Sequence, residues 1–422
     1  MKKQTICGID IGTSKIATIV AFFDQEKDKL PKLIGFATFP SLGIKRGLVI
    51  DIDKATEAIE KSIEKAEKMA GYKIEKAFVS VGGPNVSSLN SHGLVAITNS
   101  NQEITQEDVL RVIEAAQAVS LSSTRQIIEV VPSDFMVDSQ DGIKNPVGMT
   151  GVRLEVDAHI ITASKTNIKN IERCLADLGI EIEGFVFSGL ASAEAVLNET
   201  EKELGVVLVD IGAGKTDLCL YNEGSLLYSS SLPIGGRHVT NDIAVGLRVS
   251  LDSAEKIKNY LSKKINNLLT KKKINELDFS ELKIAEDLSN ISVKTLIDEI
   301  INPRLEEIFK LIYEEIEKSG LIKNVPSGLV LTGGGSLTVG IIDVSKKIIG
   351  LPVRIGIPDK IGGLIDEVLY PQYATTVGLI LFGKRKLEKL SFELKDFKKI
   401  WRDFSIGFSI DKLKKLLKQF IP

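Results

Sequence analysis

One twelve-residue stretch, Val206–Asp217, constrains the fold of this chain more than any other; it reads Val-Val-Leu-Val-Asp-Ile-Gly-Ala-Gly-Lys-Thr-Asp. Its apolar, mostly β-branched beginning predicts a short buried strand that stops at Asp210. Gly212 and Gly214 then allow a tight turn, whose backbone N–H groups can face a bound anion. Apolar residues resume after the turn, so the stretch predicts a strand, a phosphate-sized turn and a second strand.

A second copy of this pattern lies near the N-terminus. Thr5–Ile11 and Ile16–Phe23 predict two strands, which Gly12-Thr13-Ser14-Lys15 joins, and both copies contain Asp-Ile-Gly. A single glycine turn between strands is usually an ordinary hairpin. Two matching copies instead predict two similar halves that face one nucleotide.

A third glycine cluster follows in Gly328–Ser336. Leu329-Val330-Leu331 predicts a strand, Gly333-Gly334-Gly335 comes next, and Val339–Ile349 has a helical pattern. A glycine-rich backbone between a strand and a helix can pass close to a flat base or a phosphate.

These three elements resemble the phosphate and adenosine loops of the actin-like ATPase superfamily, and within it the chain is similar to the FtsA family. The resemblance covers essentially the whole chain. Further motifs that carry it are Gly151-Val-Arg-Leu-Glu155, Leu232-Pro-Ile-Gly-Gly236, Thr240-Asn-Asp-Ile-Ala244 and an amphipathic C-terminus. The resemblance implies an α/β, ribonuclease H-like fold with two lobes, an inserted α+β subdomain and a C-terminal amphipathic helix.

The expected domain boundaries follow from this resemblance and from shifts in composition. They are 1–83 and 162–190 with 370–383 for the first lobe, 84–161 for the insert, 191–245 and 328–369 for the core of the second lobe, 246–327 for its helical subdomain, 384–408 for a flexible linker and 409–422 for the amphipathic helix. In FtsA the insert, called 1C, contacts other division proteins and filament neighbours. An insert without such a role is the alternative.

Length and composition argue against a single small domain, a nucleic-acid-binding protein, a disulfide-rich protein and a membrane-spanning protein. A chain of 422 residues is longer than one core usually serves. The net charge of −2 gives no sign of nucleic-acid binding. The three cysteines are isolated, as expected in a reducing cytosol. No apolar run reaches the roughly 18 residues that span a bilayer.

The resemblance and the turns together predict one ATP·Mg²⁺ site between the lobes. Asp10 and Asp210 would hold Mg²⁺ through water, because Mg²⁺ dehydrates reluctantly. Residues of the two turns and of the glycine clusters would surround the nucleotide: Gly12, Thr13, Ser14, Lys15, Gly212, Ala213, Gly214, Lys215, Thr216, Gly235, Gly236, Gly333, Gly334, Gly335 and Ser336.

Two further residues, Glu255 and Lys258, match positions that bind adenosine in FtsA-like and DnaK-like proteins. They are three residues apart, so a surface ion pair on one helix face is the alternative. Lys215 departs from the more usual glycine-rich turn and either contacts a phosphate or points outward. A Walker A loop is excluded, because Val209 occupies its first glycine position.

Hydrolysis is expected to be weak. Related cell-shape actins carry a glutamate near the start of a helix between the lobes, where it positions the attacking water. The matching residues here are Phe187-Ser188-Gly189, which include no carboxylate.

Two regions imply binding partners. Asn302-Pro303-Arg304 matches the region where FtsA receives the acidic C-terminal peptide of FtsZ, and Arg304 could pair with a carboxylate of that peptide. The alternative is a solvated helix arginine. Near the C-terminus, apolar residues recur at helical spacing opposite lysines: Ile410, Leu413, Leu416, Leu417 and Phe420.

The C-terminal segment is basic. Residues 384–422 contain twelve basic and five acidic residues, a net charge of +7, and the rest of the chain therefore carries −9. A basic amphipathic helix on a tether is suited to an anionic membrane surface, and one such helix attaches reversibly. A helix docked on its own domain is the alternative.

The combined prediction is an ATP-binding, actin-like cell division protein that polymerises and tethers FtsZ filaments to the cytoplasmic face of the cell membrane at the division site. Its expected partners are FtsZ, further copies of itself, other division proteins and anionic lipid. A PilM-like adaptor of a pilus or secretion machine is the first alternative. An actin-fold sugar kinase is the second, although the sequence offers no acidic catalytic base for it.

Overall fold

The computed structural model describes residues 3–24, 30–266, 279–282, 284, 286, 292–363 and 366–403. The chain forms two units, residues 1–382 and 383–422, which are described separately. Within the described residues, no helix has both the length and the apolar character needed to cross a bilayer.

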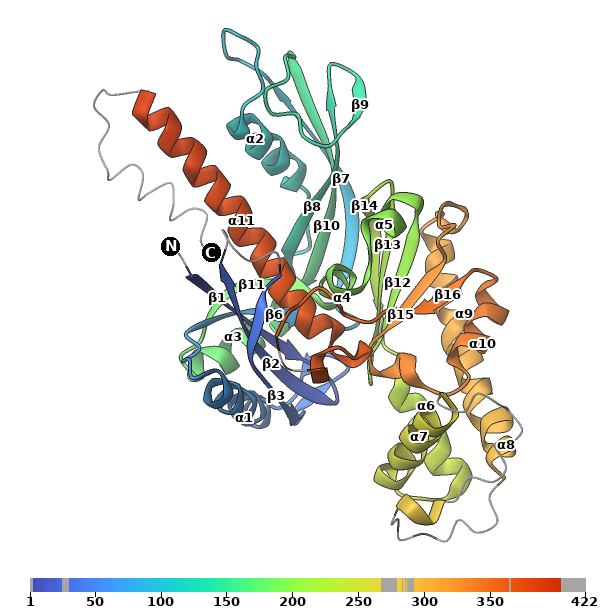
Figure 1. Ribbon diagram of the computed structural model, residues 1–422. Coiled ribbons are helices and arrows are strands. Elements are labelled where there is room, and N and C mark those ends of the chain that lie inside the picture. The colour runs from blue at the N-terminus through green and yellow to red at the C-terminus, as the bar shows by residue number, and fades with distance from the viewer. Residues whose placement is uncertain are drawn as a thin grey trace. The chain divides into compact units, whose positions relative to one another are not determined.

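The first lobe is built on a five-stranded mixed sheet (Figure 1). Its strand order is β11-β6-β1-β2-β3. The first two strands form an antiparallel hairpin that closes at Ile11 and Ile16. Helices α1 (Ile52–Ala70) and α3 (Lys165–Asp177) pack together, and α1 covers β2 and β3. The strands are β1 (Lys3–Ile11), β2 (Lys15–Asp24), β3 (Lys32–Pro40), β6 (Lys76–Val81) and β11 (Glu181–Phe187), with a small hairpin of β4 (Ile44–Lys45) and β5 (Leu48–Val49) beside them.

The second lobe repeats this architecture. Its sheet order is β14-β13-β12-β15-β16, in which β12 and β13 form the central antiparallel hairpin and β15 runs parallel to β12. Two similar halves, predicted from the repeated Asp-Ile-Gly, are therefore confirmed. The elements are β12 (Val206–Ile211), β13 (Thr216–Asn222), β14 (Ser225–Leu232), β15 (Leu329–Thr332), β16 (Val353–Ile355), α5 (Glu199–Leu204) and α10 (Ile341–Ile349).

A group of helices extends the second lobe between β14 and β15. They are α6 (Gly236–Leu247), α7 (Leu251–Asn266), α8 (Val293–Thr295), a π-helical turn (Leu296–Ile301) and α9 (Asn302–Lys318). Helix α9 has Pro303 in its first turn and buries Leu305, Ile308, Ile312 and Ile316 in the core of the lobe. Leu311 of the same helix is exposed.

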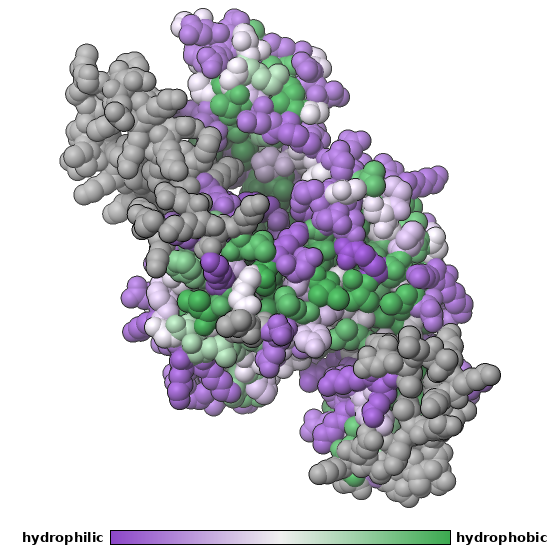
Figure 2. All heavy atoms as spheres, viewed as in Figure 1, coloured by the Kyte–Doolittle hydropathy of each residue, from purple (hydrophilic) through white to green (hydrophobic). Residues whose placement is uncertain are grey.

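The insert has its own sheet and core. Strand order is β7-β10-β8-β9, and helix α2 (Gln106–Gln117) packs on β7 and β10. Thr105 and Asp108 form the capping box that begins this helix. On the face seen in Figure 2, hydrophilic residues surround a small hydrophobic centre of the insert. The strands are β7 (Ser87–Ala96), β8 (Arg125–Val137), β9 (Gln140–Ile143) and β10 (Arg153–Ser164).

The insert leaves the first lobe after β6 and returns to it at α3, but it also contacts strand β14 of the second lobe. This contact is polar. Ser88 Oγ donates to Ser229 O at 2.7 Å, His159 Nε2 lies 2.8 Å from Ser229 Oγ, and Asn90 Nδ2 donates to Leu227 O at 3.2 Å. The insert is therefore joined to the first lobe through the chain and to the second lobe through these hydrogen bonds.

Two helices of small residues cross where the lobes meet. These are α4 (Ser188–Val196) and the first turns of α11 (Ala374–Asp403). A Cβ at Gly378 would overlap the backbone oxygen of Ala191, so the helices can approach this closely only with glycine there. Ser192 Oγ and Thr375 Oγ1 lie 2.9 Å apart across the same crossing.

The second unit differs from the expected flexible linker. Helix α11 continues to Asp403 and so covers most of 384–408. Residues 384–403 contain no glycine or proline and are rich in lysine, leucine and glutamate, all of which favour helix. The predicted membrane residues Ile410, Leu413, Leu416, Leu417 and Phe420 lie outside the described residues.

Candidate functional site

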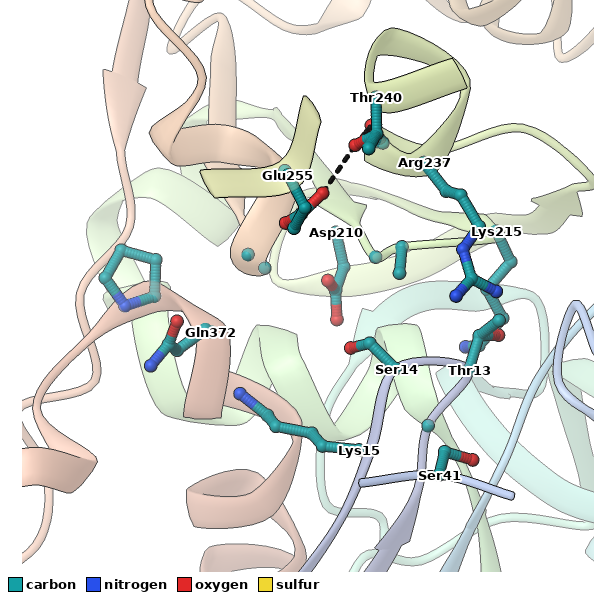
Figure 3. Close-up of a pocket in the computed structure, with 18 of the residues that line it drawn as sticks. Thr13, Ser14, Lys15, Ser41, Asp210, Lys215, Arg237, Thr240, Glu255 and Gln372 are labelled. Atoms are coloured by element: carbon teal, nitrogen blue, oxygen red, sulfur yellow. Dashed lines mark hydrogen bonds between the residues drawn. The ribbon is translucent and has the colours of Figure 1, made fainter. Parts of the chain in front are cut away.

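A cleft of about 350 Å³ lies between the two lobes (Figure 3). The two Asp-x-Gly turns line it from opposite lobes. Helices α6 and α7, the triple-glycine loop and the beginning of α11 complete its walls. The three glycine-rich stretches that the sequence singled out therefore meet at one place.

The two turns have the same internal bond. Gly12 N–H donates to Lys15 O at 3.1 Å, and Gly212 N–H donates to Lys215 O at 2.9 Å. Because these two N–H groups close the turns, the donors that can face an anion are those of the residues that follow each glycine. This geometry narrows the sequence-based expectation, which counted both glycine N–H groups as anion donors.

The two aspartates at the strand ends face the cleft from opposite lobes. Asp10 Oδ1 accepts from Ser80 Oγ at 2.7 Å. Asp210 Oδ2 accepts from Ser192 Oγ at 2.5 Å and from Thr375 Oγ1 at 3.0 Å. Burial raises the pKa of Asp10, and burial together with the nearby Asp217 raises the pKa of Asp210 to about 6.

This aspartate pair fits a Mg²⁺ ion that keeps part of its water. Among the described residues, no group of three or more His, Cys, Asp or Glu side chains is arranged to hold a metal ion. Two carboxylates, phosphate oxygens and water are the usual set for Mg²⁺ bound with a nucleotide. A cation between Asp10 and Asp210 would also offset the cost of burying them.

Lys15 points into the cleft in Figure 3. Its Nζ lies 3.8 Å from the centroid of the Tyr373 ring, a cation–π contact. Burial lowers the pKa of Lys15 to about 8, against the attraction of Asp10 and Asp210. The Lys15 ammonium thus lies at the wall of the cleft, where it can pair with a bound anion.

The Lys215 side chain points inward. Its side chain is 11% exposed, and its Nζ forms an ion pair with Asp217, which is 1% exposed. Burial alone would lower the pKa of Lys215, but Asp217, Asp210 and Asp10 outweigh it and raise the pKa. Of the two alternatives that the sequence left open, the outward orientation is wrong.

The other end of the cleft holds the predicted Glu255–Lys258 pair. Lys258 Nζ donates to Glu255 Oε2 at 2.7 Å and to Thr240 Oγ1 at 2.8 Å. Figure 3 shows Thr240 and Glu255 joined by a hydrogen bond. Lys258 is buried and all three residues line the cleft, so this pair is more than a surface ion pair.

Most of the predicted nucleotide residues line the cleft, and four do not. The exceptions support its wall: Thr216 Oγ1 donates to Ile234 O at 2.8 Å and Ser336 Oγ donates to Gly333 O at 2.7 Å. Gly214 packs against Thr13 of the opposite turn, and Gly235 comes just before α6. The predicted residues that line the cleft are Asp10, Gly12, Thr13, Ser14, Lys15, Asp210, Gly212, Ala213, Lys215, Gly236, Glu255, Lys258, Gly333, Gly334 and Gly335.

Sequence reasoning missed several lining residues. Arg237 follows Gly236 directly and Thr240 begins the next motif quoted above, so extending the Gly235-Gly236 motif would have found them. Ser41 lies in a loop and Gln372 in the short 3₁₀ turn Pro371–Tyr373. Neither has a local sequence signal, and only the tertiary fold brings them to the cleft. The missed residues are Ser41, Asp217, Arg237, Thr240, Leu251, Asp252, Asn259, Pro371, Gln372 and Thr375.

Arg304 does not belong to the cleft. It lies on α9 and pairs with Asp242 of α6, to which its Nη2 donates at 3.1 Å, and with Glu307. The alternative of a simply solvated arginine is therefore wrong, since two carboxylates engage it.

Two sequence models of protein families match the chain. Residues 83–162 match the SHS2 domain inserted in FtsA, and residues 207–378 match the family Cell division protein FtsA. The chain is 39% identical over 409 residues to cell division protein FtsA of Borreliella burgdorferi, covering 95% of this chain and 97% of that protein. It is 38% identical over 383 residues to the Pseudomonas aeruginosa FtsA, covering 91% and 90%. The Bacillus subtilis FtsA is 38% identical over 377 residues, with 89% and 83% covered.

Solved structures share the fold at much lower identity. A chain of the PilM–PilN type IV pilus biogenesis complex matches with a TM-score of 0.60 at 16% identity, covering 90% of this chain and 98% of that chain. MreB5 of Spiroplasma citri bound to ADP matches with a TM-score of 0.53 at 13% identity, covering 92% and 98%. The predicted actin-like α/β fold with its insert is confirmed.

Proposed function

Because the chain belongs to the FtsA family of cell division proteins, we propose that it binds ATP with Mg²⁺ in the interlobe cleft and tethers FtsZ filaments to the membrane at the division site. The observation that carries the nucleotide part is the pair of matching turns, one from each lobe, that line a single cleft. The MreB5 structures bound to ADP and to AMPPNP, which share this fold, support the same ligand class.

In this proposal each end of the cleft receives a different part of the nucleotide. Backbone N–H groups after Gly12 and Gly212 donate to phosphate oxygens, and the Lys15 ammonium adds a charge-assisted contact. Lys258 and Glu255, at the far end, hydrogen-bond the ribose hydroxyls. The triple-glycine loop packs against the adenosine, because glycine lets backbone approach a flat ring closely.

Asp10 and Asp210 would hold Mg²⁺ through water. When bound, Mg²⁺ supplies positive charge between the phosphates and the two aspartates. Ser80, Ser192 and Thr375 orient these carboxylates by donating hydrogen bonds to them. The start of α4 offers no carboxylate to position an attacking water, so the proposed ATPase is slow and the nucleotide mainly controls polymerisation.

In this proposal, tethering depends on three contacts of the protein: with FtsZ, with other division proteins or further copies of itself, and with lipid. The acidic peptide of FtsZ would dock near Arg304, and its carboxylate must displace Asp242 to reach the guanidinium. The insert would contact other division proteins and neighbouring copies in a filament. The basic C-terminal helix would lie on anionic lipid. A filament that carries many such helices binds far more firmly than one molecule, through effective concentration.

A vesicle sedimentation experiment tests this function as a whole. The full chain with ATP should sediment with anionic vesicles and carry FtsZ with it, whereas the chain lacking residues 409–422 should stay in the supernatant. Neutral vesicles are the control for the lysine contribution. Equal sedimentation of the full and truncated chains would contradict the membrane role, and no retention of a labelled ATP analogue by either chain would contradict the nucleotide role.

The two alternatives have less support. The pilus complex shares the fold at 16% identity, whereas the sequence relatives quoted above are division proteins at 38% or more. A sugar kinase requires a catalytic carboxylate in an open sugar cleft. Phosphorylation of a panel of sugars by this protein would revive that alternative.

A further inference from the structure

Lys215 crosses from the second lobe toward the first. It ends the second turn, and its side chain occupies a slot bounded by two glycines of the first lobe. A Cβ at Gly82 would overlap the lysine Nζ, and a Cβ at Gly47 would lie 3.2 Å from its Cδ. Glycine at these two positions leaves the space that the lysine side chain occupies.

The carboxylate of Asp217 lies at the end of the slot, where it pairs with the lysine ammonium. Lys215 Nζ pairs with Asp217, whose Oδ1 accepts from Ser231 Oγ at 2.5 Å. Ser231 Oγ in turn accepts from Gly83 N–H of the first lobe at 3.1 Å. The ammonium is therefore held in place rather than free to move with solvent.

Lys215 is also a cation that three carboxylates of the cleft share, of which Asp210 and Asp217 are buried. Its charge acts on Asp10, Asp210 and Asp217, and it lines the same cleft as the two phosphate turns. The negative phosphates of a nucleoside triphosphate would be strongly repelled by these three carboxylates if no cations were present. A divalent metal normally supplies two positive charges at such a site. The Lys215 ammonium already supplies one positive charge here.

We propose that the Lys215 ammonium is a built-in cation of the phosphate site, so that this protein binds nucleoside triphosphates with only a weak requirement for a divalent metal. The inference rests on the proposed nucleotide site, and it adds a residue that sets the metal dependence of that site. Asp10 and Asp210 still fit Mg²⁺, which adds to the affinity but is not essential for it.

The experiment compares ATP affinity in excess Mg²⁺ with ATP affinity in excess EDTA, by calorimetry on the full chain. The quantity of interest is the dissociation constant measured in EDTA divided by the one measured in Mg²⁺. In the wild type this ratio should be small. In Lys215→Met it should rise by about tenfold or more, the factor expected for the loss of one charge-assisted hydrogen bond.

Two further variants make the result decisive. Lys215→Met leaves Asp217 buried without its partner, so Lys215→Met/Asp217→Asn provides a neutral version that should fold and show the same raised ratio. Lys258→Met removes a lysine that also pairs with a carboxylate, but at the other end of the cleft. It should weaken binding by the same factor in both conditions and leave the ratio unchanged.

The outcomes separate this inference from the proposed function. A ratio that is the same in the wild type and in both Lys215 variants, or that rises equally in Lys258→Met, overturns the role of Lys215 while the nucleotide site stands. Absence of ATP binding by the wild type in both conditions overturns the proposed nucleotide site and this inference with it.

Discussion

At the scale of single residues, His159 is the clearest sensor of pH in the described chain. It is buried where the insert meets β14, with Nδ1 2.6 Å from Asn90 Oδ1 and Nε2 2.8 Å from Ser229 Oγ. Burial lowers its pKa to about 4 from an ordinary value of 6.5. Between these pH values the unfolded chain binds a proton and the folded protein does not, so stability falls as pH falls through this window.

Replacing His159 by glutamine should therefore flatten the pH dependence of stability. Thermal melting between pH 7 and pH 4 should show a steeper loss for the wild type than for His159→Gln, amounting to at most about 3 kcal/mol. Parallel melting curves of the two proteins across this range would contradict the assignment.

His92 provides the matched control, because its environment is the opposite. Its hydrogen bond to Asp157, helped by a second one to Glu155, raises the pKa of this exposed histidine. Its contribution to stability is present below its unfolded pKa and is lost as pH rises through the folded pKa. His92→Gln should therefore lower the stability of the protein at acidic pH, whereas His159→Gln should reduce the stability that is lost at acidic pH.

At the scale of secondary-structure elements, the crossing of α4 and α11 depends on one glycine. Gly378→Ala places a methyl group on the backbone oxygen of Ala191, which cannot rotate away. The helices must separate, and we expect urea denaturation to show a loss of about 1–3 kcal/mol or more.

The control for Gly378 is another glycine within a helix. A Cβ at Gly246 of α6 meets only the end of the flexible Ile300 side chain. Gly246→Ala should cost little or gain up to about 1 kcal/mol, because alanine favours helix. Equal effects of the two substitutions would show that crowding at the crossing does not limit stability.

Elements with a strong local signal were predictable from the sequence. The repeated turns lie in matching hairpins, because the glycine turns and the apolar strands on either side of them are local signals. Helix α6 begins at Gly236 without a side-chain cap, and Gly236 N–H bonds instead to Gly212 O of the turn. The triple glycine forms a 3₁₀ turn, Gly334–Leu337, before α10, which a helical pattern alone does not reveal.

Other features were not predictable because they depend on residues far away in the chain. The direction of Lys215 is set by Gly47 and Gly82 of the opposite lobe. The pairing of Arg304 with Asp242 is set by the packing of α9 on α6. The glycine turn singled out Lys215 and the resemblance to FtsA singled out Arg304, but the partners of both residues come from the tertiary fold.

At the scale of the whole molecule, Ser231 links the cleft to the point where the insert begins. It donates to Asp217 at the second turn and accepts from Gly83, where the insert begins. We expect ATP to change hydrogen exchange in β7 of the wild type by about tenfold or more, since each charged hydrogen bond is worth about 1.5–3 kcal/mol. Ser231→Ala should bind ATP but lose this distant change.

Ser230→Ala is the matched control for that experiment. Ser230 is adjacent in β14, but its Oγ donates to Glu315 on α9 at 2.6 Å and does not reach the cleft. This variant should retain the response of β7 to ATP. An ATP response in Ser231→Ala as large as in the wild type would rule out the link.

The hydrogen bonds between the insert and β14 have a consequence for regulation. Thermodynamic linkage is reciprocal: if the nucleotide alters how firmly the insert is held, a protein that grips the insert must alter nucleotide affinity by the same factor. A division protein could then set the occupancy of the cleft from a distance, without entering it.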